Sequence, residues 1–142
     1  MATYGRSRDI SASPQTVWSV WADPSTWHEW NPSVTRMDLD GPFADGVTGR
    51  MHTPSTRPHD VVFHDIDEGH SYEMQTRVIP GTLFHFRCEI APNAAGSTVR
   101  QSVHLTGPMA FLVGPLAGPG IAKSFDKVLD GLKQAVEKTG AR

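Results

Sequence analysis

Two stretches of the chain, residues 82–91 and 97–106, constrain its fold most, because they can pair as a hairpin in only one sensible register. Folding them about Ala94 and Ala95 places apolar side chains on one face and polar side chains on the other. The apolar pairs are Phe84 with Leu105, Phe86 with Val103 and Ile90 with Val99, and the polar pairs are His85 with His104 and Glu89 with Arg100. A slip of one residue would turn every side chain to the wrong face. This hairpin predicts an antiparallel sheet with one buried face.

Further strands separated by turn residues precede this hairpin. They are expected near 4–11, 34–40, 47–53, 58–66 and 70–78. A two-residue turn at Pro80-Gly81 would pair Arg77 with Phe84 and bring the wrong face inward. We therefore expect a bulge or a connection of odd length before the last hairpin.

Three helices complete the predicted α+β fold. Ser13-Pro14 and Asp23-Pro24 each combine an N-cap residue with proline at the first helical position, which predicts two short helices after the first strand. After residue 120, apolar residues recur with helical period and predict a long amphipathic helix. The glycines and prolines of 107–120 are expected to interrupt any helix before that point. The apolar stripe consists of Ile121, Phe125, Val128, Leu129, Leu132 and Val136.

Composition narrows the class of protein. A chain of 142 residues with a formal charge of −2 is expected to form one domain, residues 1–142, and to lack the basic face of a nucleic-acid binder. Its single cysteine, Cys88, excludes a disulfide framework, and no apolar run is long enough to span a membrane. The N-terminus does not read as a signal peptide, so a cytoplasmic protein is expected. The oligomeric state, monomer or homodimer, stays open.

The order of these elements resembles the START-like (SRPBCC) superfamily, the helix-grip fold, and within it the polyketide cyclase/dehydrase branch. The resemblance rests on ISASPQTVWSVWADPSTWHEWNP at 10–32, GPMAFLVGPL at 107–116 and LDGLK at 129–133. It implies a curved antiparallel sheet of about seven strands that grips the C-terminal helix around a cavity. Pro119, between Gly118 and Gly120, departs from the smooth helix start of relatives. The resemblance implies a ligand-binding cavity but does not fix the activity.

No motif for a metal, a cofactor or a nucleophile accompanies this fold. The seven histidines lack the spacing of metal ligands, and neither a nucleophile elbow nor a phosphate-binding glycine loop is present. No metal and no cofactor are therefore expected. His64, within Val61-Val62-Phe63-His64, is the one histidine retained as a candidate cavity acid or base.

The leading hypothesis is a protein that binds an apolar small molecule, lipid-like, polyketide-like or aromatic, between sheet and helix. One alternative is a polyketide cyclase or dehydratase that moves protons with Tyr72, His64 or water. Another alternative is a protein-interaction module, which a large exposed apolar patch would favour. Gln101 and Tyr72 are the expected polar groups of the cavity. The candidate lining is Trp27, Trp30, Met51, His64, Tyr72, Met74, Phe84, Phe86, Gln101, Val103, Leu105, Phe125 and Leu129.

Overall fold

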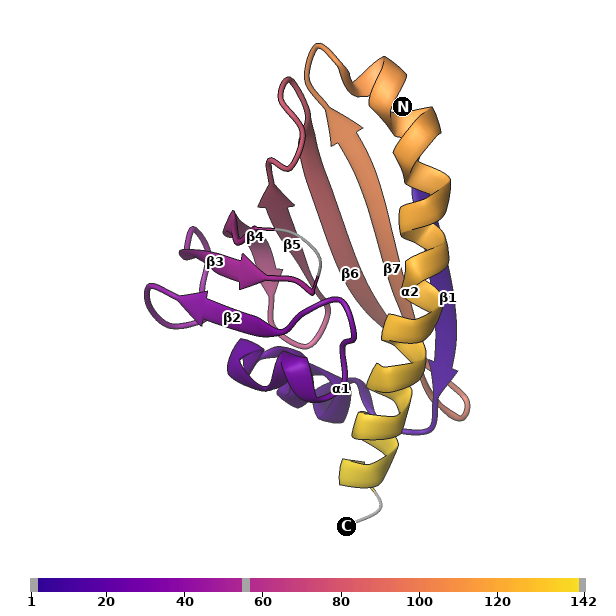
Figure 1. The fold of residues 1–142 in the computed structure, drawn as a ribbon. Coiled ribbons are helices and arrows are strands. Elements are labelled where there is room, and N and C mark those ends of the chain that lie inside the picture. Colours follow the sequence, from indigo (N-terminus) through magenta and orange to yellow (C-terminus); the bar gives the residue numbers. More distant parts are fainter. Residues whose placement is uncertain (1–2, 55–56, 141–142) are drawn as a thin grey trace.

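The computed structural model describes residues 3–54 and 57–140 and shows a single curved sheet wrapped around one long helix (Figure 1). The seven strands are antiparallel neighbours in the order β1-β7-β6-β5-β4-β3-β2. This is the predicted α+β helix-grip architecture. The strands are β1 (Tyr4–Ile10), β2 (Arg36–Leu39), β3 (Thr48–His52), β4 (His59–Asp67), β5 (Ser71–Thr76), β6 (Leu83–Asn93) and β7 (Gly96–Thr106), and the helices are α1 (Pro14–Trp21), η1 (Pro24–Glu29) and α2 (Ala110–Gly140).

The β6–β7 hairpin has the predicted register throughout. Phe84 faces Leu105, Phe86 faces Val103 and Cys88 faces Gln101. Thr76 faces Phe84 across β5 and β6, so an odd number of residues, 77–83, separates this pair, as expected. One detail of the polar face differs from expectation. Glu89 faces Arg100 in the register, but its carboxylate lies 3.8 Å from the Nε of Arg87 instead.

The two short helices begin where the sequence predicts. The Ser13 side chain accepts a hydrogen bond from the Thr16 amide at 3.3 Å and caps α1, whereas η1 is a 3-10 helix. Because both helices carry tryptophans toward the sheet, they close one end of its concave face (Figure 1). Trp21 and Trp27 are both almost fully buried there.

The prediction for the start of the last helix is wrong. α2 runs without interruption from Ala110 to Gly140, with Pro115 and Pro119 inside it. A proline within a helix removes one backbone hydrogen bond and is unfavourable in isolation. Here packing against the sheet compensates, since Ala110 and Val113 of the first turns contact the buried cluster around Phe84 and Leu105.

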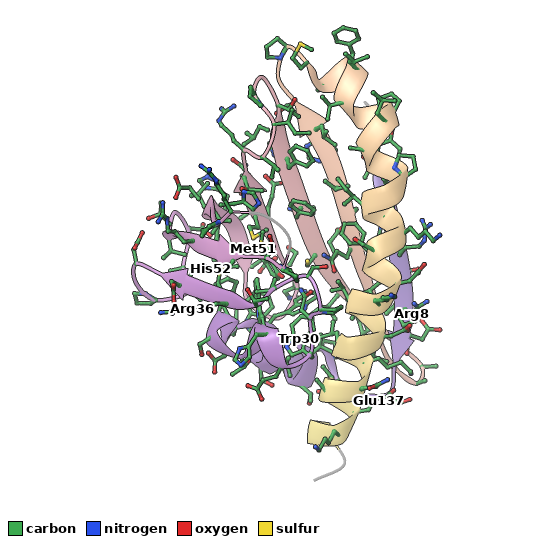
Figure 2. All side chains as sticks on the ribbon, viewed as in Figure 1. Arg8, Trp30, Arg36, Met51, His52 and Glu137 are labelled. Carbon is green, nitrogen blue, oxygen red and sulfur yellow. The ribbon has the colours of Figure 1, made fainter. Side chains whose placement is uncertain are left out.

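Two glycines let α2 approach its neighbours closely. A Cβ at Gly118 would collide with the ring of Tyr4 on β1, and a Cβ at Gly131 would collide with the carbonyl oxygen of Trp30. Ion pairs hold the same helix to the edge strand: Arg8 Nε lies 2.9 Å from an Asp130 carboxylate oxygen. α2 is therefore fixed to β1 and to the segment after η1, and Figure 2 shows Arg8 beside it.

Candidate functional site

A cavity of about 450 Å³ lies between the concave face of the sheet, the segment after η1, and α2. A volume of this order is typical of small-molecule pockets. The cavity wall is mostly apolar. Most of its sheet side consists of side chains that alternate inward along β5, β6 and β7, as the strand register requires: Tyr72, Met74, Thr76, Phe86, Cys88 and Gln101.

Aromatic rings form the inner end of the cavity. Trp27 is stacked on Tyr72 with ring centroids 5.8 Å apart, and Trp21 meets Tyr72 edge to face at 5.2 Å. The Trp27 indole donates a hydrogen bond to the Trp21 carbonyl at 3.1 Å, which fixes the two short helices to each other. Such interlocked rings are rigid and leave one apolar surface facing the cavity.

α2 supplies the opposite wall. Ile121, Phe125 and Val128 recur on one helix face and line the cavity with Ser124. Phe125 meets Phe86 of the sheet with ring centroids 6.2 Å apart. Because these residues lie near the middle of α2, the cavity occupies the central part of the gripped space.

The polar groups at the inner end are uncharged. Burial raises the pKa of the Tyr72 phenol well above its ordinary value, and the adjacent Cys88 raises it further. Burial likewise raises the pKa of the Cys88 thiol to about 12. Both groups therefore stay protonated near neutral pH, and the Tyr72 hydroxyl is available as a donor. Gln101, directly opposite Cys88, adds an amide that both donates and accepts.

No aspartate, glutamate, lysine or arginine is among the described lining residues, and His59 is the only histidine. Near the segment after η1, the polar lining comes from Asn31 and Ser33, and the Asn31 side chain accepts a hydrogen bond from the Ser33 amide at 2.8 Å. A charged ligand would find no carboxylate, ammonium or guanidinium group among these lining residues. The cavity is therefore suited to a neutral molecule.

Most of the predicted lining residues meet in this cavity. Eight of them lie in its wall: Trp27, Trp30, Met51, Tyr72, Met74, Phe86, Gln101 and Phe125. Figure 2 shows Trp30 between the short helices and the lower part of α2.

The other five predicted residues lie elsewhere. Phe84, Val103 and Leu105 point inward but pack with Ala122 into a solid cluster beside the cavity, and Leu129 is fully buried in the main core. His64 requires a correction, because it faces Glu73 in the β4–β5 register. Its neighbours Phe63 and Met74 are the inward pair, so His64 belongs to the outer face and not to the cavity.

Several lining residues were missed, and some of them had a usable signal. Thr76 alternates with Met74, and the register of the hairpin puts Cys88 opposite Gln101 on the inner face. Ile121 and Val128 share the helical face of Phe125. Residues 31–34 and Thr53 had no such signal, because their position depends on how the loops cross the open end of the sheet.

The outer face of the sheet carries a separate polar network. His85 Nδ1 lies 3.1 Å from the Glu73 carboxylate and His85 Nε2 lies 2.8 Å from the Thr106 hydroxyl. His104 stacks on His85 with ring centroids 4.3 Å apart. Burial and the neighbouring His85 both lower the pKa of His104. Within residues 3–54 and 57–140, no cluster of three or more histidine, cysteine or acidic side chains forms a metal site.

Comparison with known proteins agrees with this geometry. The family described as polyketide cyclase / dehydrase and lipid transport matches residues 1–137. Because that match covers nearly the whole sequence, the chain belongs to this family. A search of curated proteins gave no match. Membership of the family supports a role in binding a hydrophobic ligand or in cyclising one.

Solved structures share the fold at low sequence identity. Protein MLL2253 from Mesorhizobium loti has a TM-score of 0.77 at 17% identity, covering 97% of this chain and 98% of that one. Ara h 8.0201 has a TM-score of 0.77 at 12% identity, covering 95% and 97%. The di-domain ARO/CYC StfQ from the steffimycin biosynthetic pathway has a TM-score of 0.80 at 10% identity, covering 99% of this chain and 52% of StfQ. These similarities establish the START-like fold.

Proposed function

We propose that this protein binds a neutral, largely apolar small molecule that carries a carbonyl or hydroxyl group. The observation that carries the proposal is the composition of the cavity wall. Its apolar surface lies beside a small uncharged polar group made by Tyr72, Cys88 and Gln101. Apolar walls supply affinity, and a few placed polar groups orient the ligand.

A role in cyclisation is the second candidate. The family description includes polyketide cyclases, and the Tyr72 phenol stands in the cavity as a proton donor. Because its raised pKa keeps the phenol protonated and makes it a weaker acid, Tyr72 would donate a hydrogen bond to a developing oxyanion and would not act as a base. Of the two groups suggested by the sequence for proton transfer, only Tyr72 lines the cavity.

The binding proposal is tested with Nile red, a neutral apolar fluorophore with a carbonyl group. Phe86 lines the cavity between Phe84 and Phe125 and is replaced with alanine. The expected result is a loss of Nile red affinity of about tenfold, because one aromatic wall is removed. His85→Ala, on the other face of the same strand, is the matched control and should retain wild-type affinity.

The variant Gln101→Leu then tests the contribution of cavity polarity to binding separately from that of cavity shape. It removes the amide while keeping a side chain of similar size, and should weaken a carbonyl-bearing probe more than a pure hydrocarbon of similar size. Native mass spectrometry of the purified protein should show a co-purified neutral ligand. If Phe86→Ala binds Nile red as wild type while His85→Ala does not, ligand binds to the other face and the proposal is wrong.

A further inference from the structure

The large apolar side chains that stay exposed in the described part of the chain all lie at one end of the molecule. Phe111 and Leu116 are each 78% exposed, far more than side chains of this size in a folded core. With Val78, Ile79, Met109 and Leu112 they form what we call the apolar tip. The tip combines the β5–β6 connection with the first turns of α2, which lie together at the upper end in Figure 1.

The two segments of the apolar tip are in direct contact. The Met109 amide donates a hydrogen bond to the Gly81 carbonyl at 3.0 Å. A Cβ at Gly81 would lie 2.7 Å from Cγ of Met109, so glycine allows this close packing. The two segments that carry the exposed side chains therefore pack together at one end of the molecule. Contiguous exposed apolar surface of this kind marks an interaction site.

The chemistry of the apolar tip favours a lipid surface over a protein. Residues 107–122 contain no charged side chain and no hydrogen-bonding side chain, and Arg77 is the one charged residue of the 77–82 connection. Protein interfaces usually include directional hydrogen bonds across the contact, which these side chains cannot make. A bilayer needs none, and its anionic headgroups complement Arg77.

The apolar tip also adjoins the candidate site. Val78 is 44% exposed and at the same time lines the cavity. Ile121, at the end of the uncharged stretch of α2, lines it as well. A ligand that passes between cavity and surroundings beside Val78 would therefore meet an apolar surface.

We propose that the apolar tip docks this protein on the surface of a lipid bilayer, with Phe111 and Leu116 entering the headgroup–acyl boundary and Arg77 at the headgroups. No helix in the described residues has the length and hydropathy needed to cross a membrane, so docking is peripheral. Docking goes beyond the proposed ligand binding, and only its purpose, exchange of ligand with the bilayer, rests on that proposal.

The test is flotation of the purified protein with phosphatidylcholine vesicles containing about one-fifth phosphatidylglycerol. Wild-type protein should float with the vesicles. Phe111→Ser combined with Leu116→Ser should lower the partition coefficient by about tenfold or more, because two apolar anchors are lost. Arg77→Gln should weaken binding several-fold on these vesicles and leave binding to pure phosphatidylcholine unchanged. Val62→Ser, an apolar-to-polar change on the outer face of β4, is the matched control and should float as wild type.

A second measurement locates the contact. Phe111→Cys, labelled with an environment-sensitive fluorophore, should brighten on vesicles and be quenched by nitroxide-labelled lipid. The proposal is overturned if wild-type protein stays unbound, or if the double serine variant floats equally well. It is also overturned if sedimentation shows that the apolar tip instead joins two copies and the label is never quenched by lipid.

Failure of docking and failure of ligand binding can be told apart. The double serine variant changes only exposed side chains outside the cavity wall, so it should bind Nile red in solution with wild-type affinity. Loss of flotation with intact Nile red binding supports docking by the tip. Intact flotation of Phe86→Ala, together with its weakened Nile red binding, shows that the two properties are separate.

Discussion

The two halves of α2 differ in composition and in what they contact. From Ile121 onward the helix is amphipathic: Phe125, Leu129 and Leu132 are buried against the sheet, while lysines and acids point outward. From Ala110 to Gly120 the outward residues are apolar and the helix contains Pro115 and Pro119. The C-terminal half is a structural helix that holds the fold together, and the N-terminal half presents a surface.

The helical conformation of each half is stabilised in a different way. The C-terminal half combines helix-forming residues with a buried stripe and with ion pairs from Arg6 and Arg8 to Asp126. The N-terminal half has poor intrinsic helix propensity, because proline and glycine are the two least favourable residues. Its helical form depends on packing of Gly118 against Tyr4 and of Val113 against the Phe84 cluster.

The largest expected effect separates the two halves by one matched pair of variants. Leu129 is fully buried, so Leu129→Ala should lower the free energy of unfolding by about 2–5 kcal/mol. Leu116 is 78% exposed, and Leu116→Ala should change it by no more than about 0.5 kcal/mol. Urea unfolding followed by circular dichroism measures both. Equal losses would mean that the apolar tip is packed core and that the comparison fails.

A second pair tests glycine in each half. Gly131→Ala places a methyl group against the Trp30 carbonyl and should destabilise the protein by about 1–3 kcal/mol. Gly120→Ala meets no neighbour within 4 Å and should stabilise it by up to about 1 kcal/mol through helix propensity. Urea midpoints report both changes. Stabilisation by both variants would show that helix propensity, and not the contact with Trp30, determines the effect of these substitutions on α2.

The sequence predicted the sheet better than the helix for a physical reason. Strand register follows from alternation along the chain: Phe86 opposite Val103 turns both side chains inward, and a slip of one residue would turn the strand's apolar face outward. Helix propensity is a weaker guide, because tertiary contacts override it. Pro115 and Pro119 therefore suggested an interruption where the structure has a continuous helix.

The sequence predicts which side chains face the cavity, but it does not predict the extent of the cavity. Alternation identifies which side chains point inward, but it does not say where α2 fills the space between them. Phe84 and Leu105 are inward and packed, because Ala122 and Phe125 reach them. Tyr72 and Met74 are inward and border empty space. That distinction depends on the position of the helix along the sheet, which periodicity does not give. His64 could be kept only as a candidate because both faces of its segment are apolar in sequence, and the structure puts it on the outer face.

The smallest expected effect concerns the ionic contacts that only the C-terminal half has. A hydrogen bond from Lys133 and one from the Ser11 amide lower the pKa of Glu137 from its ordinary value of 4.5. A carboxyl whose pKa is lowered on folding stabilises the protein above its unfolded pKa, and this contribution is lost as pH falls through the lowered value. Glu137 is partly exposed, so Glu137→Gln should cost only about 0.5 kcal/mol at pH near 7. The difference from wild type should vanish once the pH is well below 4.5.

Urea unfolding at both pH values measures this difference, with Glu29→Gln on the exposed end of η1 as a control that should match wild type at neutral pH. A difference that persists unchanged in acid would show that Glu137 acts through packing, and the C-terminal half would then be held by its apolar stripe alone.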